Sequence, residues 1–531
     1  MDKKYCAYIC AGCGIGDALD MEALSEVVSG EMSMECKTHD CLCGKDGRAF
    51  IEADVAGGVN TLVVGACSPR VMTREFDFGN GTITVRANLR EQVVWAEVKP
   101  AEGEEANSAA TEFLQETASD YLRMACTRAK KTAPAEPYLL EVINKTILVM
   151  GGGLAGLTAA KEAAAAGYNV ILVEKDDKLG GKALGWRKSF PTKSPWQDLE
   201  ENPIGALIAE VEADSRISVK TSSEVARISG APGDFGVSLK ATGSKSEWDA
   251  PAKVTVEDAE KIEKGEMADP NTGLKKYTEL NPEAVKVGAV VLATGWTPAD
   301  VSQFAHLGYG SVKNVVTNAE FEKLAKAGKV PASVAFVQSP GGKDNDQDFP
   351  YCNSVTSMVA LKQAQYVCED NADGKAYVVY QHMRTPGNME LFYKSVQNNN
   401  DGIFFTKGSV TAVSEAGGKL SVAVEDTLLG EDINLDVDMV VLAAGMEPTT
   451  LHENSINLAY RQGPAFSDLG LFDGYADSHF ICFPYETRRT GVYACGGVRK
   501  AETMEEAVDD ATGAALKAIQ CIESVDRGVS V

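Results

Sequence analysis

Long apolar runs and an excess of basic residues are both missing from this sequence. No segment approaches the ~18 consecutive apolar residues that a membrane-spanning helix needs, and the N-terminus, MDKKYCAYIC, lacks the apolar core of a signal peptide. The 51 Lys and Arg are outnumbered by 76 Asp and Glu, which gives a net charge of -25. Nucleic-acid binding needs clustered basic residues. We therefore expect a cytoplasmic protein that does not bind nucleic acid and does not insert directly into a membrane.

Cysteine is distributed unevenly along the chain. An odd total of 13 without a signal peptide does not suit a disulfide framework, and no ferredoxin-type C-x-x-C-x-x-C-x-x-x-C-P run occurs. The early concentration of cysteines predicts metal or redox chemistry in the N-terminal segment. Seven of them lie within the first 67 residues: Cys6, Cys10, Cys13, Cys36, Cys41, Cys43 and Cys67.

This N-terminal segment alternates predicted strands (3–10, 33–37, 59–67) with predicted helices (21–30, 46–58). Each strand leads into cysteine. Because the carboxyl ends of parallel strands meet at one edge of a sheet, we expect the cysteine loops to converge there.

Convergence favours a metal site over a redox dithiol or inert packing. A dithiol would use only Cys10 and Cys13, and a phosphate-binding loop would explain the glycines of YICAGCGIGDALD but not the thiols. Four thiolates suit a four-iron cluster, and tetrahedral zinc would accept the same set. The residues themselves leave this choice of metal open.

The length of 531 residues predicts about three domains. A helix is expected over 108–131, and Pro134 and Pro137 then mark a linker with a domain boundary near residue 138.

The segment from 145 to 181 carries the strongest motif. It predicts a strand, a glycine turn, a small-residue helix and a second strand that ends in Glu174. Gly151, Gly153 and Gly156 form G-x-G-x-x-G, in which the glycines allow a tight turn, close approach to a pyrophosphate and helix packing. Glu174 is placed to accept hydrogen bonds from ribose hydroxyls. The segment therefore predicts a dinucleotide site.

Later motifs resemble those of FAD-binding flavoproteins with two dinucleotide-binding domains. These motifs are VEKDDKLGGK, VVLATGW, VVLAAGMEP and GVYACGGV. The resemblance implies FAD and directs the final helix, 501–519, at the flavin pyrimidine. Where the family usually has an Asp for the ribityl chain, this sequence has Gly497. The implied cofactor-binding residues are Gly151, Gly153, Leu154, Ala155, Gly156, Glu174, Lys175, Gly180, Gly181, Lys182, Ala293, Thr294, Gly295, Gly445, Gly496 and Gly497.

The middle of the chain occupies the place of an NAD(P)H domain but has no second G-x-G-x-x-G. Its loop, QSPGGKDND, brings three carboxylates, Asp344, Asp346 and Asp348, near the expected phosphate position. Cys352 begins a predicted helix, where a thiol has a lowered pKa, yet CNSV supplies one cysteine of a C-x-x-C, which disfavours direct disulfide reduction. The expected domains are 1–137 (iron–sulfur, with a helical linker), 138–295 (FAD, first part), 296–448 (degenerate NAD(P)-like) and 449–531 (FAD, C-terminal part).

Nearly the whole length resembles the flavoprotein component of heterodisulfide reductases, HdrA, and its relatives in the quinone-interacting membrane-bound oxidoreductase (Qmo) complex. The segments YICAGCGIGDALD, GACSPRV, ANLREQVVW, GGGLAGLTAA, NVVTNAEFE and YCNSVTSMVALKQAQYV carry the resemblance, and the first three are closer to the B-type Qmo subunit. The resemblance implies a thioredoxin-reductase-like α/β flavoprotein fold preceded by a small cysteine-rich α/β domain. It also implies a 4Fe-4S cluster on Cys10, Cys13, Cys43 and Cys67, with Cys36 and Cys41 as spares.

The same resemblance implies electron relay within a complex, converting two-electron to one-electron transfer in anaerobic, sulfur-type energy metabolism. The expected partners are iron–sulfur and membrane quinone-reactive subunits, which would bring the chain to the inner membrane face. HdrA carries further ferredoxin-like cysteine modules that this sequence lacks, so full bifurcating machinery is not expected here. The alternatives are a stand-alone NAD(P)H-dependent oxidoreductase and a non-catalytic scaffold; no residue is assigned a catalytic role.

Overall fold

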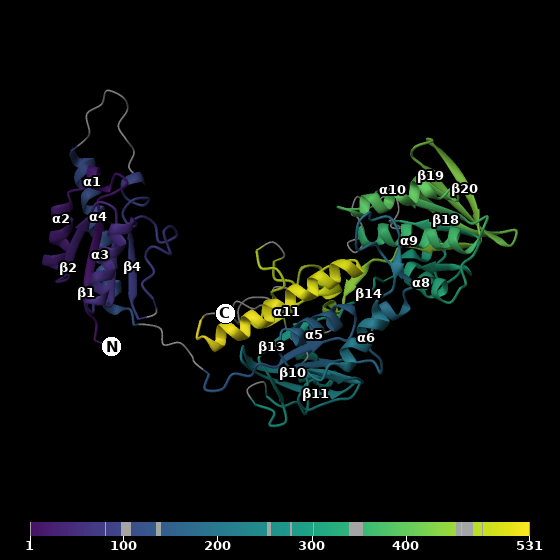
Figure 1. Cartoon of the computed structure of the whole chain (residues 1–531), viewed down its shortest axis with the longest axis horizontal. Helices are drawn as coiled ribbons and strands as arrows, with labels where there is room; N and C mark the ends of the chain where they lie inside the picture. The colour runs from purple at the N-terminus through teal and green to yellow at the C-terminus, as the bar shows by residue number, and fades with distance from the viewer. Residues whose placement is uncertain are drawn as a thin grey trace. The chain divides into compact units, whose positions relative to one another are not determined.

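The computed structural model describes residues 2–79, 81–96, 108–133, 140–251, 256–276, 279–300, 302–338, 354–452, 458, 471–479 and 482–529. The chain divides into two compact units, Met1–Tyr138 and Leu139–Val531 (Figure 1). Each unit has its own sheets and its own core.

The first unit is built on a parallel four-stranded sheet in the order β2-β1-β3-β4. Its strands are β1 (Tyr5–Cys10), β2 (Glu35–His39), β3 (Thr61–Ala66) and β4 (Ile83–Asn88). Three of them match the predicted strands, and β4 is additional. Its helices are α1 (Ile15–Ala18), α2 (Met21–Glu26), α3 (Lys45–Ala56) and α4 (Ser108–Lys131); a short π-helical turn, Val27–Glu31, continues α2.

Alternation along β1 sends side chains to two separate cores. Ala7 and Ile9 pack with residues of α2 and α4, whereas Cys6, Tyr8 and Cys10 pack with Ile51 of α3 and other residues on that face. Helices therefore cover both faces, as a parallel sheet requires, and the open edge lies at the carboxyl ends of the strands.

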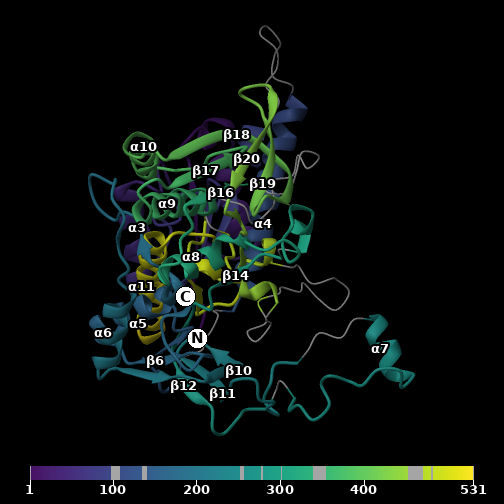
Figure 2. The ribbon, with the colours of Figure 1, turned by 90° about the vertical axis from the view of Figure 1, so that its right-hand side faces the viewer.

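The second unit begins with a parallel five-stranded sheet in the order β23-β13-β5-β6-β9. One face packs against α5 and α11, which contact each other closely through alanines such as Ala160 and Ala514 (Figure 2). The other face packs against an antiparallel three-stranded sheet. The elements are β5 (Ile147–Met150), α5 (Leu154–Ala165), β6 (Val170–Val173), α6 (Ile204–Ala213), β9 (Ile217–Lys220), β10 (Ser223–Ala231), β11 (Asp234–Ala241), α7 (Val256–Glu263), β12 (Val285–Val287), β13 (Ala289–Leu292), β23 (Val492–Ala494) and α11 (Met504–Asp526).

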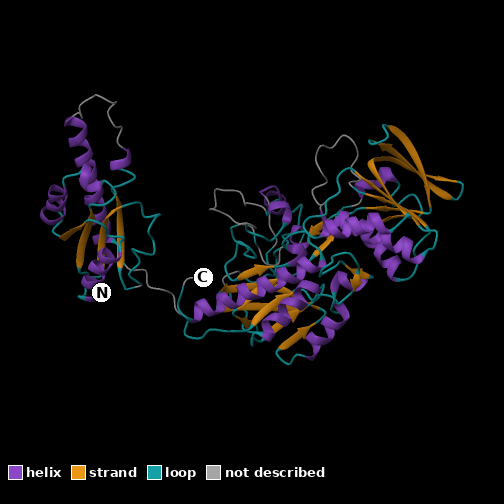
Figure 3. Ribbon diagram, turned by 45° about the horizontal axis from the view of Figure 1, so that its top comes forward, coloured by secondary structure: helices purple, strands orange, loops and turns teal. Residues whose placement is uncertain are grey.

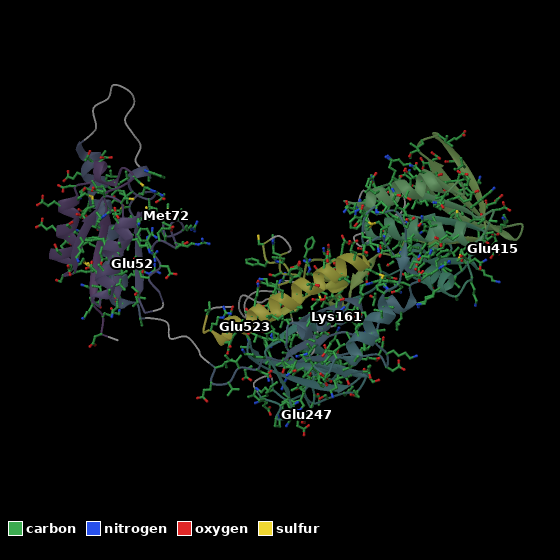
Figure 4. All side chains as sticks on the ribbon, in the orientation of Figure 1. Glu52, Met72, Lys161, Glu247, Glu415 and Glu523 are labelled. Carbon is green, nitrogen blue, oxygen red and sulfur yellow. The ribbon has the colours of Figure 1, made fainter. Side chains whose placement is uncertain are left out.

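Side chains tie these helices to their neighbours. Lys161 on α5 forms a 2.6 Å ion pair with Glu210 on α6. Glu523, near the end of α11, accepts a 2.6 Å hydrogen bond from the hydroxyl of Tyr168. Figure 4 labels Lys161 and Glu523 on their helices. These contacts fix α5, the helix that opens with the glycine motif.

A second lobe of this unit holds a seven-stranded sheet in the order β15-β21-β16-β17-β18-β19-β20. Its first five strands are parallel and its last two antiparallel, with helices packed against the parallel part (Figure 3). The elements are β15 (Val315–Thr317), α8 (Asn318–Lys326), β16 (Ser333–Val337), α9 (Ser354–Asp370), β17 (Lys375–Tyr380), α10 (Met389–Asn399), β18 (Ile403–Ala416), β19 (Lys419–Asp426), β20 (Glu431–Val437) and β21 (Met439–Leu442).

Two short antiparallel strands, β14 (Trp296–Pro298) and β22 (Met446–Pro448), join the lobes where the chain crosses between them. A further short pair is β7 (Lys188–Ser189) and β8 (Glu200–Glu201). Two α/β lobes joined in this way make a two-dinucleotide-binding-domain architecture, as expected from the sequence. Within the described residues, no helix has the length and apolar character to span a membrane.

Candidate functional site

The cysteine loops of the first unit meet at the carboxyl edge of its sheet. Cys10 ends β1, Cys67 directly follows β3, and Cys41 and Cys43 lie in the loop after β2. The Sγ atoms of Cys41 and Cys43 are 3.8 Å apart. Burial raises the pKa of Cys43 to about 11, and the neighbouring thiols of Cys41, Cys10 and Cys67 add to the shift. Thiols from all three loops are therefore close enough to influence one another.

A glycine shortly after Cys10 is required by the close approach of two loops. A Cβ on Gly12 would collide with the carbonyl oxygen of Asp40, and the preceding residue, Ala11, donates its N–H to the carbonyl of His39 at 2.9 Å. Cys13 itself has a left-handed backbone, with φ of 55°. Local geometry thus brings the Cys10–Cys13 bend onto the cysteine loop that follows β2.

Two arginines beside these thiols were missed by the sequence analysis, because it did not predict β4. Arg86, on β4, donates from Nη2 to Cys67 Sγ at 3.2 Å, and its guanidinium stacks 4.1 Å from the Phe76 ring centroid. Arg90 interacts with Cys13 and forms a 2.7 Å ion pair with Glu91. Both cations stabilise negative charge on sulfur. The alternating stretch TITVRAN was the signal that could have revealed them.

The donor set fits a cluster better than a single ion. No three or more His, Cys, Asp or Glu side chains in the described part of the chain are arranged to hold a metal ion. In a four-iron cluster each thiolate binds a different iron, so the sulfurs are spaced more widely than around one ion. Soft thiolates from converging loops, with cations beside them, are the donors that iron–sulfur clusters use.

Cys36 and Cys126 belong to a different environment. Cys36 is the register partner of Ala7, on the sheet face that packs against α4, and Cys126 lies in that same core. Burial raises the pKa of both thiols. They are core residues, and the structure does not bring them to the cysteine loops.

The glycine motif of the second unit forms an open cradle after β5. Gly151 has φ of 103°, and a Cβ there would collide with the carbonyl of Ala293. A Cβ on Gly156 would collide with the carbonyl of Gly151, whereas one on Gly153 would meet no atom within 4 Å. The first and third glycines are therefore needed by the fold itself. The second leaves the free space that a pyrophosphate requires.

Glu174 closes this loop from the end of β6. It is buried, its Oε2 accepts the N–H of Gly152 at 2.6 Å, and its Oε1 accepts the N–H of Asp176 at 2.8 Å. Gly180 donates its N–H to the carbonyl of Gly152 at 2.7 Å. The second glycine pair is thus packed directly on the first loop, and contact of Glu174 with a ribose stays a prediction.

The other expected flavin residues fall into two groups. Leu154, Ala155, Ala293 and Gly496 surround the cradle, since a Cβ on Gly496 would lie 2.7 Å from that of Ala155. The rest lie further along the same edge or at the junction of the lobes. Thr294 shares a 2.7 Å hydroxyl hydrogen bond with Thr449, Gly445 accepts from Ala299 at 3.0 Å, Lys182 lies 6.0 Å from the Trp296 ring, Lys175 is exposed, and Gly181 and Gly295 have positive φ.

The structure explains why Gly497 replaces the usual Asp. A Cβ at Gly497 would collide with the indole ring of Trp296, so no larger residue fits there. The loop is held instead by a buried ionic network. Asp510 of α11 accepts the N–H of Gly496 at 3.0 Å and binds Arg499, which also donates to Asp477 at 2.9 Å.

A pocket with about 600 Å³ of empty space, partly open to solvent, lies where the two lobes of the second unit meet. Aromatic walls come from Trp186 and Trp296, and Glu322, Lys362 and Glu502 supply charged or titratable groups. An apolar cleft with few polar groups is typical of a small-molecule or cofactor site. No motif predicted this pocket.

Lys362 on α9 is the buried cation of the pocket wall. Only 4% of its side chain is exposed, and its Nζ donates to Glu322 Oε1 and to the carbonyl of Lys188, each at 3.1 Å. Burial lowers the pKa of Lys362, and Glu322 opposes that shift. Glu322 also accepts from Tyr366 and Gln363. The pair is thus well satisfied within the wall.

Asp344, Asp346, Asp348 and Cys352, which the sequence analysis singled out in the middle of the chain, lie outside the described residues.

Comparison with known proteins follows the same division. The FAD-dependent oxidoreductase family matches residues 146–229. The chain is 29% identical to the A-type component of the H(2):CoB-CoM heterodisulfide,ferredoxin reductase of Methanothermobacter thermautotrophicus, covering 96% of this chain and 84% of that protein. It is 26% identical to the second iron-sulfur A-type component of the CoB--CoM heterodisulfide reductase of Methanopyrus kandleri, covering 98% of this chain and 86% of that protein.

Solved structures also match. Thioredoxin reductase from T. acidophilum aligns with a TM-score of 0.42 and 17% identity, covering 71% of this chain and 98% of that one. The Lactococcus lactis thioredoxin reductase aligns with a TM-score of 0.44 and 13% identity, covering 72% and 99%.

Proposed function

Because the chain is an HdrA-like flavoprotein and an oxidoreductase component, we propose that it relays electrons within a multisubunit complex. FAD would exchange electron pairs and an iron–sulfur cluster single electrons. The chain thereby converts two-electron into one-electron transfer.

The second unit supplies the flavin site. Gly153 provides the open position for the pyrophosphate, and Gly151 and Gly156 shape the turn around it. The N-terminus of α5 directs its free N–H groups at this position and stabilises the negative charge. Arg499 and Asp510 hold the Gly496 loop beside Ala155. These residues orient the dinucleotide along the edge of the five-stranded sheet.

The first unit supplies the cluster. Cys10, Cys13, Cys43 and Cys67 are the proposed ligands, and Cys41 is the nearest spare, with its sulfur 3.8 Å from that of Cys43. Arg86 donates to the sulfur of Cys67. Hydrogen bonds and positive charge beside the sulfurs favour the more reduced, more negative state of a cluster.

The observation that carries the proposal is the meeting of three cysteine loops at one sheet edge in a chain that also contains a complete dinucleotide cradle. Anaerobic purification followed by counts of flavin, iron and acid-labile sulfide tests it. We expect about one FAD and about four irons with matching sulfide per chain. Stoichiometric zinc without sulfide, or a colourless protein after supplementation with FAD, would reject it.

The proposed partners are subunits that hold further iron–sulfur clusters or a membrane quinone site, as in a Qmo-type complex of sulfur metabolism. The lack of a described membrane-spanning helix and the resemblance of the first unit to a B-type Qmo subunit support this assignment. The chain would then be cytoplasmic and bound to the membrane face through those partners.

A further inference from the structure

Glu502 is a buried acid that no contact within the described chain explains. It is 4% exposed and lines the pocket between the lobes, yet neither of its carboxyl oxygens has a hydrogen-bond partner among the described residues. The nearest cation, the half-exposed ammonium of Lys500, is 3.9 Å away, beyond hydrogen-bond distance. An unsatisfied buried carboxyl is costly, which indicates that a bound molecule normally completes it.

The helix that follows does not use this carboxyl. Thr503 caps α11, accepting the N–H of Glu506 at 3.3 Å, and Glu506 in return accepts the N–H of Thr503 at 2.8 Å. This capping box satisfies the helix terminus without Glu502. The carboxyl therefore lies free at the pocket wall, at the start of the helix that packs on α5.

The surrounding charges keep this group neutral near pH 7. Burial raises the pKa of Glu502 to about 9, with further contributions from the negative charges of Asp510 and Glu506, whereas Lys500 and Arg499 oppose the shift. On the far wall, Glu322 and Lys362 form an ion pair, so their charges largely cancel at this distance. A neutral carboxyl can donate one hydrogen bond.

The pocket lies next to the dinucleotide cradle. Trp296, one of its aromatic walls, contacts the Gly497 position, and the preceding Gly496 contacts Ala155 of the cradle helix. A planar ring attached to a dinucleotide held at Gly153 would reach this space, with Trp186 and Trp296 as apolar surfaces. The flavin ring is such a group and offers carbonyl oxygens and ring nitrogens as acceptors.

We propose that Glu502 is a cofactor-binding residue that donates a hydrogen bond from its protonated carboxyl to an acceptor atom of the flavin ring in this pocket. The inference rests on the proposed FAD site and adds a side-chain contact that no sequence motif marks.

The test measures FAD affinity of the deflavinated full-length protein by fluorescence titration from about pH 6 to about pH 9.5, across the expected pKa of Glu502. The variants are Glu502→Gln, which keeps a donor but cannot ionise, and Glu502→Ala, which removes the donor. Glu505→Gln is the matched control, since Glu505 lies in the same first turn but does not line the pocket. Free FAD titrates identically with every variant, so differences between variants report on the protein.

We expect wild-type affinity to fall by about tenfold as Glu502 ionises, the size of one hydrogen bond. Glu502→Gln should bind as wild type at pH 7 and lack this fall, Glu502→Ala should bind more weakly at pH 7, and the control should follow wild type. Equal affinity of the Ala variant, a Gln variant as weak as Ala, or the same pH dependence in wild type and the Gln variant would overturn the inference while leaving the FAD site in place. Failure of wild type to bind FAD would overturn both.

Discussion

At the scale of single residues, the same residue type serves two different needs in the glycine motif. Gly151 and Gly156 are required by backbone contacts that exist without any ligand, but Gly153 has open space around its Cα. Their roles as turn and packing glycines could be predicted from spacing alone, because the motif encodes local backbone geometry. Glu502 could not, because its burial depends on the packing of two lobes.

Gly153→Val is expected to abolish FAD retention while leaving the fold intact, because the new side chain would fill the pyrophosphate space, where a Cβ meets no protein atom. Gly205→Val, in open space on the exposed side of α6, is the matched control and should retain FAD. Flavin absorbance of the purified variants and circular dichroism measure the two properties. Full FAD occupancy in Gly153→Val would contradict the assigned cradle.

Glu502 also makes the stability of the FAD-free protein depend on pH. Its pKa is about 9 in the folded chain against 4.5 as the ordinary value, so between these values the folded state binds more protons and stability falls as pH rises. Glu502→Gln removes this dependence. We expect the Tm of the variant to exceed that of wild type increasingly from about pH 6 to about pH 9, measured by thermal unfolding. Parallel Tm curves would contradict the raised pKa.

At the scale of elements, the parallel strands decide where the thiols meet. The strands β1, β2 and β3 could be predicted because short apolar runs lead directly into cysteine. The fourth strand could not, since a long irregular stretch separates it from β3, and with it the guanidinium groups of Arg86 and Arg90 were missed. Convergence of the cysteine loops followed from topology, whereas the choice between Cys41 and Cys43 depends on side-chain directions within one loop.

Serine at Cys10, Cys13, Cys43 or Cys67 should lower iron and sulfide content and alter the cluster's EPR signal, because each substitution removes one thiolate ligand. FAD should remain bound, since its cradle belongs to the other unit. Cys126→Ser is the control and should change neither, because Cys126 lies in the core on the opposite face of the sheet. Loss of iron with Cys41→Ser but not Cys43→Ser would exchange these two ligands.

At the scale of the whole molecule, two units carry two kinds of site. The division after Tyr138 accompanies the change from a cysteine-rich sheet to the two-lobed flavoprotein fold. The second lobe keeps the strands and helices of a nucleotide domain, but its sequence lacks the second glycine fingerprint and has Asp344, Asp346 and Asp348 in the corresponding loop. The pocket between the lobes arises only from their packing, and for that reason no local pattern announced it.

We expect that neither NADH nor NADPH reduces the FAD of the isolated chain on a turnover timescale. Hydride transfer requires an anchored nicotinamide dinucleotide, and the carboxylates of the QSPGGKDND loop would repel its phosphates. Anaerobic stopped-flow absorbance measures the reaction, and a strong chemical reductant provides the positive control. Rapid bleaching by either nucleotide would favour a stand-alone NAD(P)H-dependent oxidoreductase instead.

The central claim, that one chain joins a two-electron carrier to a one-electron carrier, is tested most directly by anaerobic reductive titration of the purified chain with dithionite. The account predicts uptake of about three electrons per chain, two with bleaching of the flavin absorbance and one with the appearance of a cluster EPR signal. Uptake of two electrons with no EPR signal from iron, or of one electron with no flavin change, would contradict it.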